Sequence, residues 1–530
     1  MTKANSEIRI HKPQIFWRLF PLIVVVVYLT GLTIPLLGPD EPRYSEVARE
    51  MFERGDWVTP TLGGFDWFEK PALLYWLQIA AYKIFGVSEF AARFGSALFG
   101  LGTILSLWIL GRWSVVGGQW SDKIRDPKSE IRDRANWLAL VAASSLGLIA
   151  FSRGASFDII LTFPVTASLV SFFVWDSENR KAQSAKRKYL PLILFYFFIG
   201  VALLAKGLIG IVFPFAIVAF YYLLSRKFPS KTFILSLFWG TVVSLLVAAA
   251  WYLPMYRANG WKFVDEFFIQ HHFQRYTSNK YQHPQPFYFF FWVLPLMTLP
   301  WLPFFFASIW NLLKNLFSRK DAKTQSTDEN LPVSPSPFLP FSSSPLLLFS
   351  TAWLLVPLVF FSLSGSKLPG YILPALPAAI ILTTESVWRF VRKGRARRIF
   401  VKAIAIATLI VVALLAQFFV GGFLHEETVK HLIDTANARG YRTEKILALH
   451  TVSHSAEFYG AGRLLREPDG KQKRLYGVSQ VIEEMKRDNA RQSLVIVPLE
   501  YKNQLLNNVE LETELLGDNG ELAIVIVKFR

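Results

Sequence analysis

Long apolar segments alternate with short segments rich in Lys and Arg up to residue 420. Most of the apolar segments approach the roughly 20 residues that a helix needs to cross the hydrocarbon core of a bilayer. Inside a bilayer the backbone must satisfy its own hydrogen bonds, which favours helices. The pattern therefore predicts a polytopic α-helical membrane protein with about eleven crossings, at residues 20–37, 94–110, 137–150, a segment ending at 173, two within 189–224, 233–254, 287–310, 346–363, 371–388 and 403–420.

The basic segments predict the orientation of the chain. Cytoplasmic loops of membrane proteins are enriched in Lys and Arg, and these residues concentrate here before residue 20, within 112–134 and within 389–398. We therefore expect the amino terminus inside and the carboxyl terminus outside. No small-residue cleavage site follows the first apolar segment, so we expect a retained anchor and not a signal peptide.

The short apolar segment 72–85 needs a separate assignment. The charged segment before it is expected outside and the basic loop that begins at Arg112 inside, so only one net crossing fits between them. That crossing is assigned to residues 94–110, which are long enough to span. The segment 72–85 is then expected to form a surface-lying or re-entrant helix.

The composition changes after His425, where the chain becomes typical of a soluble domain. The segments ILALH, SLVIVPL and LAIVIVKF indicate buried strands, and VSQVIEEMKRD indicates a helix. We predict a membrane domain over residues 1–421 and a small extracytoplasmic α/β domain over residues 422–530.

The totals exclude several classes of protein. Of the 530 residues, 52% are hydrophobic, as is typical of membrane proteins, and the repeated apolar segments of about 20 residues exclude a single soluble domain. The net charge of +18 follows from the basic loops, so we interpret it as a sign of topology and not of nucleic-acid binding. The chain has no cysteine, which excludes disulfides, thiolate metal sites and a cysteine nucleophile.

A dense cluster of charged residues follows the first apolar segment, between Gly38 and Pro71. Within it, Tyr44, Val47, Ala48, Met51 and Phe52 recur at helical spacing, which predicts an amphipathic helix that lies on the bilayer surface. Pro42 suits the first turn of this helix and Gly55 its end. Asp40 then has two interpretations, a functional carboxylate or a residue that caps the helix.

The predicted topology brings acidic, basic and histidine side chains to the outer face. Carboxylates among cations suit a reaction in which a lipid-linked phosphate is the donor and a carboxylate binds or deprotonates the acceptor. Lys206 is equally consistent with a lysine that extends to the interface, and Glu69 with His272 could hold a divalent ion. The outer residues are Asp40, Glu69, Lys70, Asp158, Lys206, His271, His272, Arg275, His283 and Lys367.

Five motifs in the same order, DEPRYSEVAREM, FEKPALLYW, SRGASFD, QHHFQRY and SKLPGYILP, resemble those of bacterial family-39 glycosyltransferases. The chain is most similar to the aminoarabinose transferases that modify lipid A, which are related to protein O-mannosyltransferases. The resemblance implies a C-type glycosyltransferase fold with about 11 to 13 transmembrane helices and juxtamembrane helices in the first outer loop. It also implies an undecaprenyl-phosphate-linked sugar as donor, a place in the cytoplasmic (inner) membrane, and an active site on the periplasmic side.

The resemblance also implies roles for single residues. Asp40 would be the catalytic carboxylate, with Glu69 and Asp158 as further catalytic carboxylates that line the cavity. The donor phosphate would be bound by Lys70, Lys206, Arg275 and Tyr371, and the sugar or acceptor by Arg43, Tyr44 and Lys367. Glu69 and His272 would be ligands of a possible divalent metal ion. The chain departs from its relatives at Gly370, where they commonly read KLPTYILP, and in its C-terminal region, where they usually carry more spans.

These expectations combine into one function with alternatives. We expect a sugar to be transferred from a polyprenyl phosphate to a lipid A-like glycolipid or other acceptor, with inversion at the anomeric carbon. The alternatives are a transferase with a protein acceptor, like the O-mannosyltransferases, a membrane transporter, and a receptor that uses the outer α/β domain. Charged residues cluster in outer loops and not within the spans, which disfavours the transporter.

Overall fold

The computed structural model describes residues 12–114, 127–179, 189–274, 284–324, 344–419 and 428–530. The chain divides into two compact units. The first consists of residues 1–29, 96–153 and 157–411, and the second of residues 30–95, 154–156 and 412–530.

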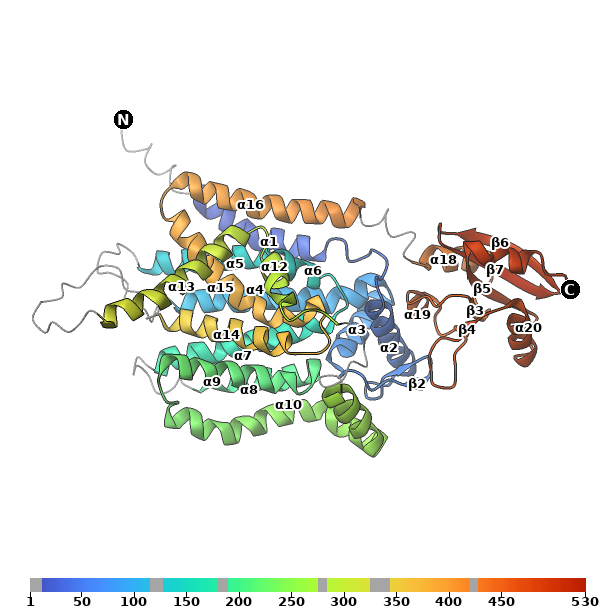
Figure 1. The fold of residues 1–530 in the computed structure, drawn as a ribbon, viewed down its shortest axis with the longest axis horizontal. Helices are drawn as coiled ribbons and strands as arrows, with labels where there is room; N and C mark the ends of the chain where they lie inside the picture. The colour runs from blue at the N-terminus through green and yellow to red at the C-terminus, as the bar shows by residue number, and fades with distance from the viewer. Residues whose placement is uncertain (1–11, 115–126, 180–188, 275–283, 325–343, 420–427) are drawn as a thin grey trace, which may run out of the picture. The chain divides into compact units, whose positions relative to one another are not determined.

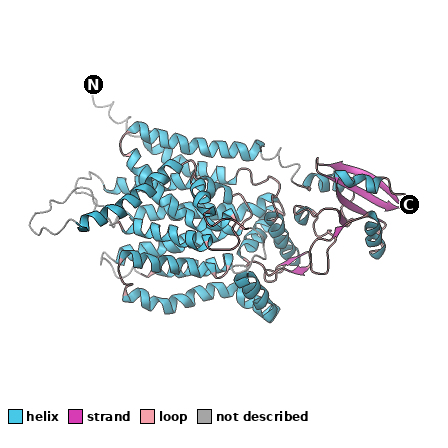
Figure 2. Cartoon of the chain, viewed as in Figure 1, coloured by secondary structure: helices cyan, strands magenta, loops and turns pink. Residues whose placement is uncertain are grey.

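The first unit is helical, and most of its long helices run alongside one another (Figures 1 and 2). The helices of this unit, long and short, are α1 (Lys12–Leu29), α4 (Glu89–Ser114, which begins in the second unit), α5 (Pro127–Ala143), α6 (Leu146–Phe151), α7 (Phe157–Asn179), α8 (Leu190–Lys206), α9 (Ile209–Ser225), α10 (Lys231–Val264), η3 (Asp265–Gln274), α12 (Phe289–Met297), α13 (Leu302–Thr324), α14 (Pro345–Ser362), η5 (Pro369–Ala375), α15 (Leu376–Val391) and α16 (Arg395–Leu414). The end of α16 and the following η6 (Leu415–Phe419) belong to the second unit.

Among the described residues, six helical stretches are long and apolar enough to cross a membrane, and four shorter apolar helices accompany them. The predicted break at residues 205–207 is confirmed, because α8 ends at Lys206 and Gly207 leaves the helical conformation with φ of 70°. Three predicted spans differ from the structure, and one of them, residues 137–150, is divided between α5 and α6. The first predicted span ends at Leu29 and not at 37, since Gly31 adopts φ of 77°, and residues 287–310 form two helices, α12 and α13.

Tilted and edge-to-face aromatic pairs connect α7 and α8, the helices that carry Asp158 and Lys206, with their neighbours. Phe172 of α7 lies 5.7 Å from Phe195 of α8 and 6.0 Å from Tyr222 of α9, measured between ring centroids. Its neighbour Phe173 lies 5.1 Å from Phe349 of α14. Aromatic pairs at these separations add to the free energy gained by burial. The rings therefore hold the later part of α7 against α8, α9 and α14.

The second unit begins with the predicted charged segment, which forms α2 (Asp40–Arg54), the hairpin strands β1 (Thr61–Leu62) and β2 (Phe65–Asp66), and α3 (Leu73–Phe85). The predicted helix and its end at Gly55, with φ of 67°, are confirmed. Its apolar face packs on α3, where Tyr82 donates a hydrogen bond to the carbonyl of Ser45 at 3.1 Å. The helix is less amphipathic than expected, because Glu46 and Arg49 are also buried.

The same unit ends in an α/β fold with a five-stranded sheet in the order β4-β3-β5-β7-β6. Strands β3, β4 and β5 are mutually parallel, whereas β7 runs antiparallel to β5 and to β6. The elements are α18 (Lys430–Ala438), β3 (Ile446–Leu449), α19 (Ala456–Tyr459), β4 (Arg474–Leu475), α20 (Val478–Arg487), β5 (Gln492–Pro498), η7 (Leu499–Tyr501), α21 (Lys502–Leu506), β6 (Leu511–Asp518) and β7 (Leu522–Phe529).

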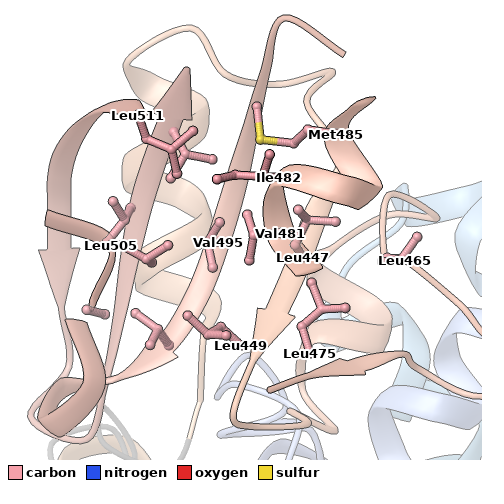
Figure 3. Close-up of a cluster of buried hydrophobic side chains, with 14 residues drawn as sticks. Leu447, Leu449, Leu465, Leu475, Val481, Ile482, Met485, Val495, Leu505 and Leu511 are labelled. Atoms are coloured by element: carbon pink, nitrogen blue, oxygen red, sulfur yellow. The ribbon is translucent and has the colours of Figure 1, made fainter. Parts of the chain in front are cut away.

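Figure 3 shows the apolar core between one face of this sheet and α20, where Val481, Ile482 and Met485 meet Leu447 and Val495. The three strands and the helix predicted from sequence correspond to β3, β5, β7 and α20. The boundary predicted at residue 421 stays a prediction, since the compact unit also includes residues 30–95.

Candidate active site

A buried ion pair fixes the loop that leads into α2. Arg93, of which 1% is exposed, donates to both carboxylate oxygens of Glu41, at 3.0 Å from Nε and 2.6 Å from Nη2. The same guanidinium donates to the carbonyls of Leu32 at 3.1 Å and Pro35 at 2.9 Å. Glu41 also accepts from the amide of Ala155 at 2.6 Å. The loop before α2 is therefore held at several points, and the first turn of α2 with it.

Sequence reasoning missed the pairing of Arg93 with Glu41. The available signal was the position of Arg93 at the beginning of a long apolar segment, where an unpaired charge would be costly. The partner could not be read from the sequence, because 52 positions separate the two residues.

The α/β fold provides a second support for α2. Arg49 of α2 donates from Nη1 to the carbonyl of Phe458 in α19 at 2.9 Å. Its guanidinium also forms an ion pair with Glu46. One residue further on, the hydroxyl of Tyr459 accepts from the amide of Leu36 at 2.9 Å and lies 3.1 Å from a carboxylate oxygen of Glu89. The loop that precedes α2 is therefore also held by a hydrogen bond to α19.

Asp40 lies at the first position of α2, with 49% of its side chain exposed. Its Oδ1 accepts a hydrogen bond from Nη2 of Arg43 at 2.5 Å. The capping position belongs to Pro39, and no side chain makes a capping hydrogen bond there. The interpretation of Asp40 as a helix cap is therefore wrong, and its carboxylate lies at the surface beside a cation.

Arg43 lies among the other predicted residues of this unit. Its guanidinium carbon lies 5.6 Å from the ring centroid of Tyr44 and 5.3 Å from that of Trp67. Burial alone would lower the pKa of Arg43, but Glu69, Tyr44 and Asp40 together raise it above its ordinary value. Burial, followed by the charges of Glu69 and Asp40, raises the pKa of the Tyr44 phenol. Arg43 is thus a cation, and Tyr44 a neutral phenol, over the physiological pH range.

Glu69 and Lys70 complete this first cluster. Nζ of Lys70 donates to Oε1 of Glu69 at 2.8 Å, and both side chains are about nine-tenths buried, with 12% and 9% exposed. The structure therefore brings together five predicted residues, namely Asp40, Arg43, Tyr44, Glu69 and Lys70. Of the three carboxylates predicted to be catalytic, only Asp40 is not paired with a lysine in the described part of the chain.

A second cluster lies in the first unit, where α7 begins and α8 ends. Lys206 forms an ion pair with Oδ1 of Asp158, and its Nζ lies 4.9 Å from the ring centroid of Tyr371. The side chains of Asp158 and Lys206 are 17% and 15% exposed. Lys206 is therefore fixed by a carboxylate and an aromatic ring, which disfavours the interpretation that it only extends to the interface.

Gly370 fits closely against this pair. A Cβ atom at Gly370 would lie 1.9 Å from Oδ2 of Asp158 and 2.8 Å from a ring carbon of Phe151, both well inside contact distance. Gly370 stands where the relatives' KLPTYILP motif has a threonine. The absence of a side chain at Gly370 leaves room for the carboxylate of Asp158.

The remaining predicted residues have other surroundings or lie outside the described structure. Lys367 is buried, and its Nζ donates to the carbonyls of Ser364 at 2.6 Å and Gln285 at 3.1 Å. These bonds fix the SGSKLPG loop, so Lys367 has a structural role here. Arg275 and His283 lie outside the described residues, as do the side chains of His271 and His272. Within the described ranges, no group of three or more His, Asp or Glu side chains could hold a metal ion.

Comparison with known proteins finds one family model and several relatives of this chain. Residues 19–116 and 128–264 match the family model of dolichyl-phosphate-mannose-protein mannosyltransferase. The chain is 29% identical over 411 residues to the undecaprenyl phosphate-alpha-4-amino-4-deoxy-L-arabinose arabinosyl transferase of Aeromonas salmonicida, a match that covers 75% of this chain and 66% of the relative. Its identity to the enzyme of the same name from Pseudomonas aeruginosa is 31% over 382 residues, with 70% and 60% covered.

The chain is therefore similar to the family-39 glycosyltransferases. The matches span slightly less than two thirds of the length of these curated relatives. Among solved structures, ArnT from Cupriavidus metallidurans bound to undecaprenyl phosphate superposes with a TM-score of 0.70 at 21% identity, and covers 98% of both chains. The archaeal oligosaccharyltransferase AglB from Archaeoglobus fulgidus has a TM-score of 0.52 at 14% identity, and covers 92% of this chain and 70% of its own. The chain therefore has the C-type glycosyltransferase fold and is a multi-pass membrane protein.

Proposed function

We propose that this protein transfers a sugar from a polyprenyl-phosphate donor to a hydroxyl group of an acceptor at the outer face of the cytoplasmic membrane. The relatives named above are undecaprenyl-phosphate aminoarabinose transferases, so undecaprenyl phosphate is the expected carrier. The observation that carries the proposal is Asp40, a half-exposed carboxylate beside Arg43 on a loop that Arg93, Glu41 and Tyr459 hold in place.

In the proposed reaction, the acceptor oxygen attacks the anomeric carbon while the bond from that carbon to the phosphate oxygen breaks. The phosphate leaves with the electron pair, and the hydroxyl proton passes to Asp40. A single displacement inverts the configuration at the anomeric carbon. General base catalysis needs a carboxylate within hydrogen-bond reach of the hydroxyl. Asp40 suits this role better than Glu69 or Asp158, because 49% of its side chain is exposed against 9% and 17% of theirs.

The leaving phosphate requires cations. Lys206, held against Asp158 and the ring of Tyr371, is the proposed phosphate contact of the first unit. In the second unit, Nε of Arg43 is buried without a hydrogen-bond acceptor among the described residues, which supports its predicted role as a contact of the sugar or acceptor. A buried donor without an acceptor gains free energy when a ligand oxygen supplies one. Arg275 remains a predicted contact to the same phosphate.

The acceptor and the metal ion belong to the proposal only. A lipid A-like glycolipid is the acceptor that the names of the relatives suggest, with a protein hydroxyl as the alternative. If Glu69 and His272 hold a divalent ion, treatment of the purified protein with EDTA lowers the transfer rate and Mg²⁺ or Mn²⁺ restores it. An unchanged rate after EDTA treatment would reject that metal site.

The decisive experiment follows a radiolabelled sugar from undecaprenyl phosphate to lipid A in vesicles that contain the purified protein. Asp40→Asn keeps the shape of the side chain and removes the base, so transfer should slow roughly a hundred- to ten-thousandfold. Binding of undecaprenyl phosphate and the melting temperature should stay close to those of the wild type. A rate close to the wild type would remove Asp40 from the mechanism. Absence of any transfer by the wild type, with transport of the lipid across the vesicle membrane, would favour the transporter.

A further inference from the structure

The sheet of the α/β fold has an edge at which ligands commonly bind. Strands β3, β4 and β5 are parallel, so their carboxyl ends meet at one edge of the sheet. In the sheet, β4 lies on one side of β3 and β5 lies on the other. The connections that leave β3 and β5 therefore diverge, which creates a topological switch point. In open α/β sheets, ligands bind outside the carboxyl ends of the strands at such a point.

Three of the strands are followed there by an aromatic or imidazole side chain. His450 comes directly after β3 and Tyr476 directly after β4, and Tyr501 ends the short helix η7 that follows β5. The rings of His450 and Tyr501 lie with centroids 4.4 Å apart, and Nε2 of His450 lies 3.0 Å from the amide oxygen of Gln504. On β4, the guanidinium of Arg474 lies 5.3 Å from the ring centroid of Tyr476.

The backbone of His450 has an unusual conformation. Its φ of 59° lies in the left-handed region, which costs free energy for a residue other than glycine. The amide of His450 donates to the carbonyl of Leu475 at 2.7 Å, which ties this residue to the end of β4. Residues held in such conformations cluster at functional sites. The bond keeps the imidazole at the switch point.

Arg474, Tyr476 and Gln504 are exposed to solvent, and His450 and Tyr501 are half-buried. Tyr476 is 64% exposed, although a tyrosine ring gains free energy when it is covered. Together the five side chains offer flat apolar rings, a neutral amide, an imidazole and a guanidinium. The rings suit the C–H face of a pyranose, and the polar groups suit its hydroxyl or phosphate substituents.

We propose that His450, Arg474, Tyr476, Tyr501 and Gln504 form a binding site for the phosphorylated saccharide part of the acceptor. This inference rests on the proposed function, because it assigns to that reaction the means of holding its acceptor. The site lies in the same compact unit as Asp40. Only five residues lie between His450 and the start of α19, a path of at most about 20 Å, and α19 is bonded to α2 through Arg49.

The test measures saccharide binding separately from transfer. The probe is the bis-phosphorylated glucosamine disaccharide that remains when lipid A is deacylated, titrated by ligand-observed NMR against the full-length protein in detergent. Tyr476→Ala and Tyr501→Ala should each weaken binding roughly three- to tenfold, the usual worth of one aromatic contact. Tyr189→Ala, at a tyrosine that is 55% exposed in the other unit, is the matched control and should bind as the wild type does.

The outcomes separate this inference from the proposed function. Weaker binding in the two variants, with undecaprenyl phosphate bound as before, supports the site. Wild-type affinity in both variants, or no affinity of the wild type for the disaccharide while transfer to lipid A proceeds, overturns it and leaves the proposed function intact. Specific binding of the disaccharide by a protein that transfers no sugar would overturn the proposed function and retain the site.

Discussion

Replacement of Gly370 by alanine places a methyl group where the carboxylate of Asp158 now lies. The added Cβ would approach Oδ2 to 1.9 Å, whereas nonbonded atoms of this kind stay about 3.5 Å apart. Asp158 would have to move by roughly 1.5 Å. Because Lys206 holds the other oxygen of the same carboxylate, this movement breaks or distorts the ion pair.

The magnitude follows from the burial of the pair. With both side chains more than four-fifths buried, the lost charge-assisted hydrogen bond is worth about 1.5–3 kcal/mol. If Lys206 must be oriented to receive the donor phosphate, Gly370→Ala slows transfer roughly ten- to hundredfold. The affinity for undecaprenyl phosphate should fall in parallel. Both are measured on purified protein, the first by transfer of the labelled sugar and the second by a lipid-binding titration.

Gly394 provides the matched control. A Cβ at Gly394 has no atom within 4 Å, and its φ is not in the left-handed region. Gly394→Ala should therefore leave transfer, lipid affinity and melting temperature unchanged. If Gly370→Ala performs as Gly394→Ala does, the pairing of Asp158 with Lys206 is not needed for the reaction, and the phosphate role of Lys206 loses its structural basis.

Three further predictions concern single contacts. Lys206→Met should weaken binding of undecaprenyl phosphate while Lys206→Arg retains part of it, and equal loss in both variants in a lipid-binding titration would contradict a role based on charge. Arg93→Met leaves the buried carboxylate of Glu41 without its partner. The free energy of unfolding should fall by about 3–5 kcal/mol. A melting temperature like that of the wild type would show that the ion pair does not hold the loop. Tyr459→Phe removes the hydrogen bonds to Leu36 and Glu89. The free energy of unfolding should fall by about 1 kcal/mol for each lost bond. An unchanged thermal transition would argue against this support.

The sequence was sufficient wherever a local pattern determines the structure. Helix α2 follows from the spacing of its apolar residues and from Gly55, and the break between α8 and α9 from Gly207. The core strands β3, β5 and β7 are continuous apolar runs. Strand β6 lacks this signal, because residues such as Glu512 and Glu514 alternate with apolar ones in an edge strand.

The contacts of the candidate site depend on pairings that no local pattern contains. Sequence placed Asp158 and Lys206 on one side of the membrane, but it gave no reason to pair them across 48 positions. Lys367 was predicted to contact a sugar, because a lysine in an outer loop has the same local pattern whether it binds a ligand or backbone carbonyls. The structure shows it bound to two carbonyls.

The bonds between α2 and α19 also affect the order in which this protein matures. Arg49 and Phe458 are 409 positions apart, and Leu36 and Tyr459 are 423 apart. At about 5–20 residues per second, a ribosome needs roughly 20 to 80 seconds to synthesise the chain between them. The loop that carries Asp40 emerges early, but it gains these supports only when the last part of the chain has folded. A truncated or still growing chain can therefore insert its first helices without acquiring the supported position of Asp40.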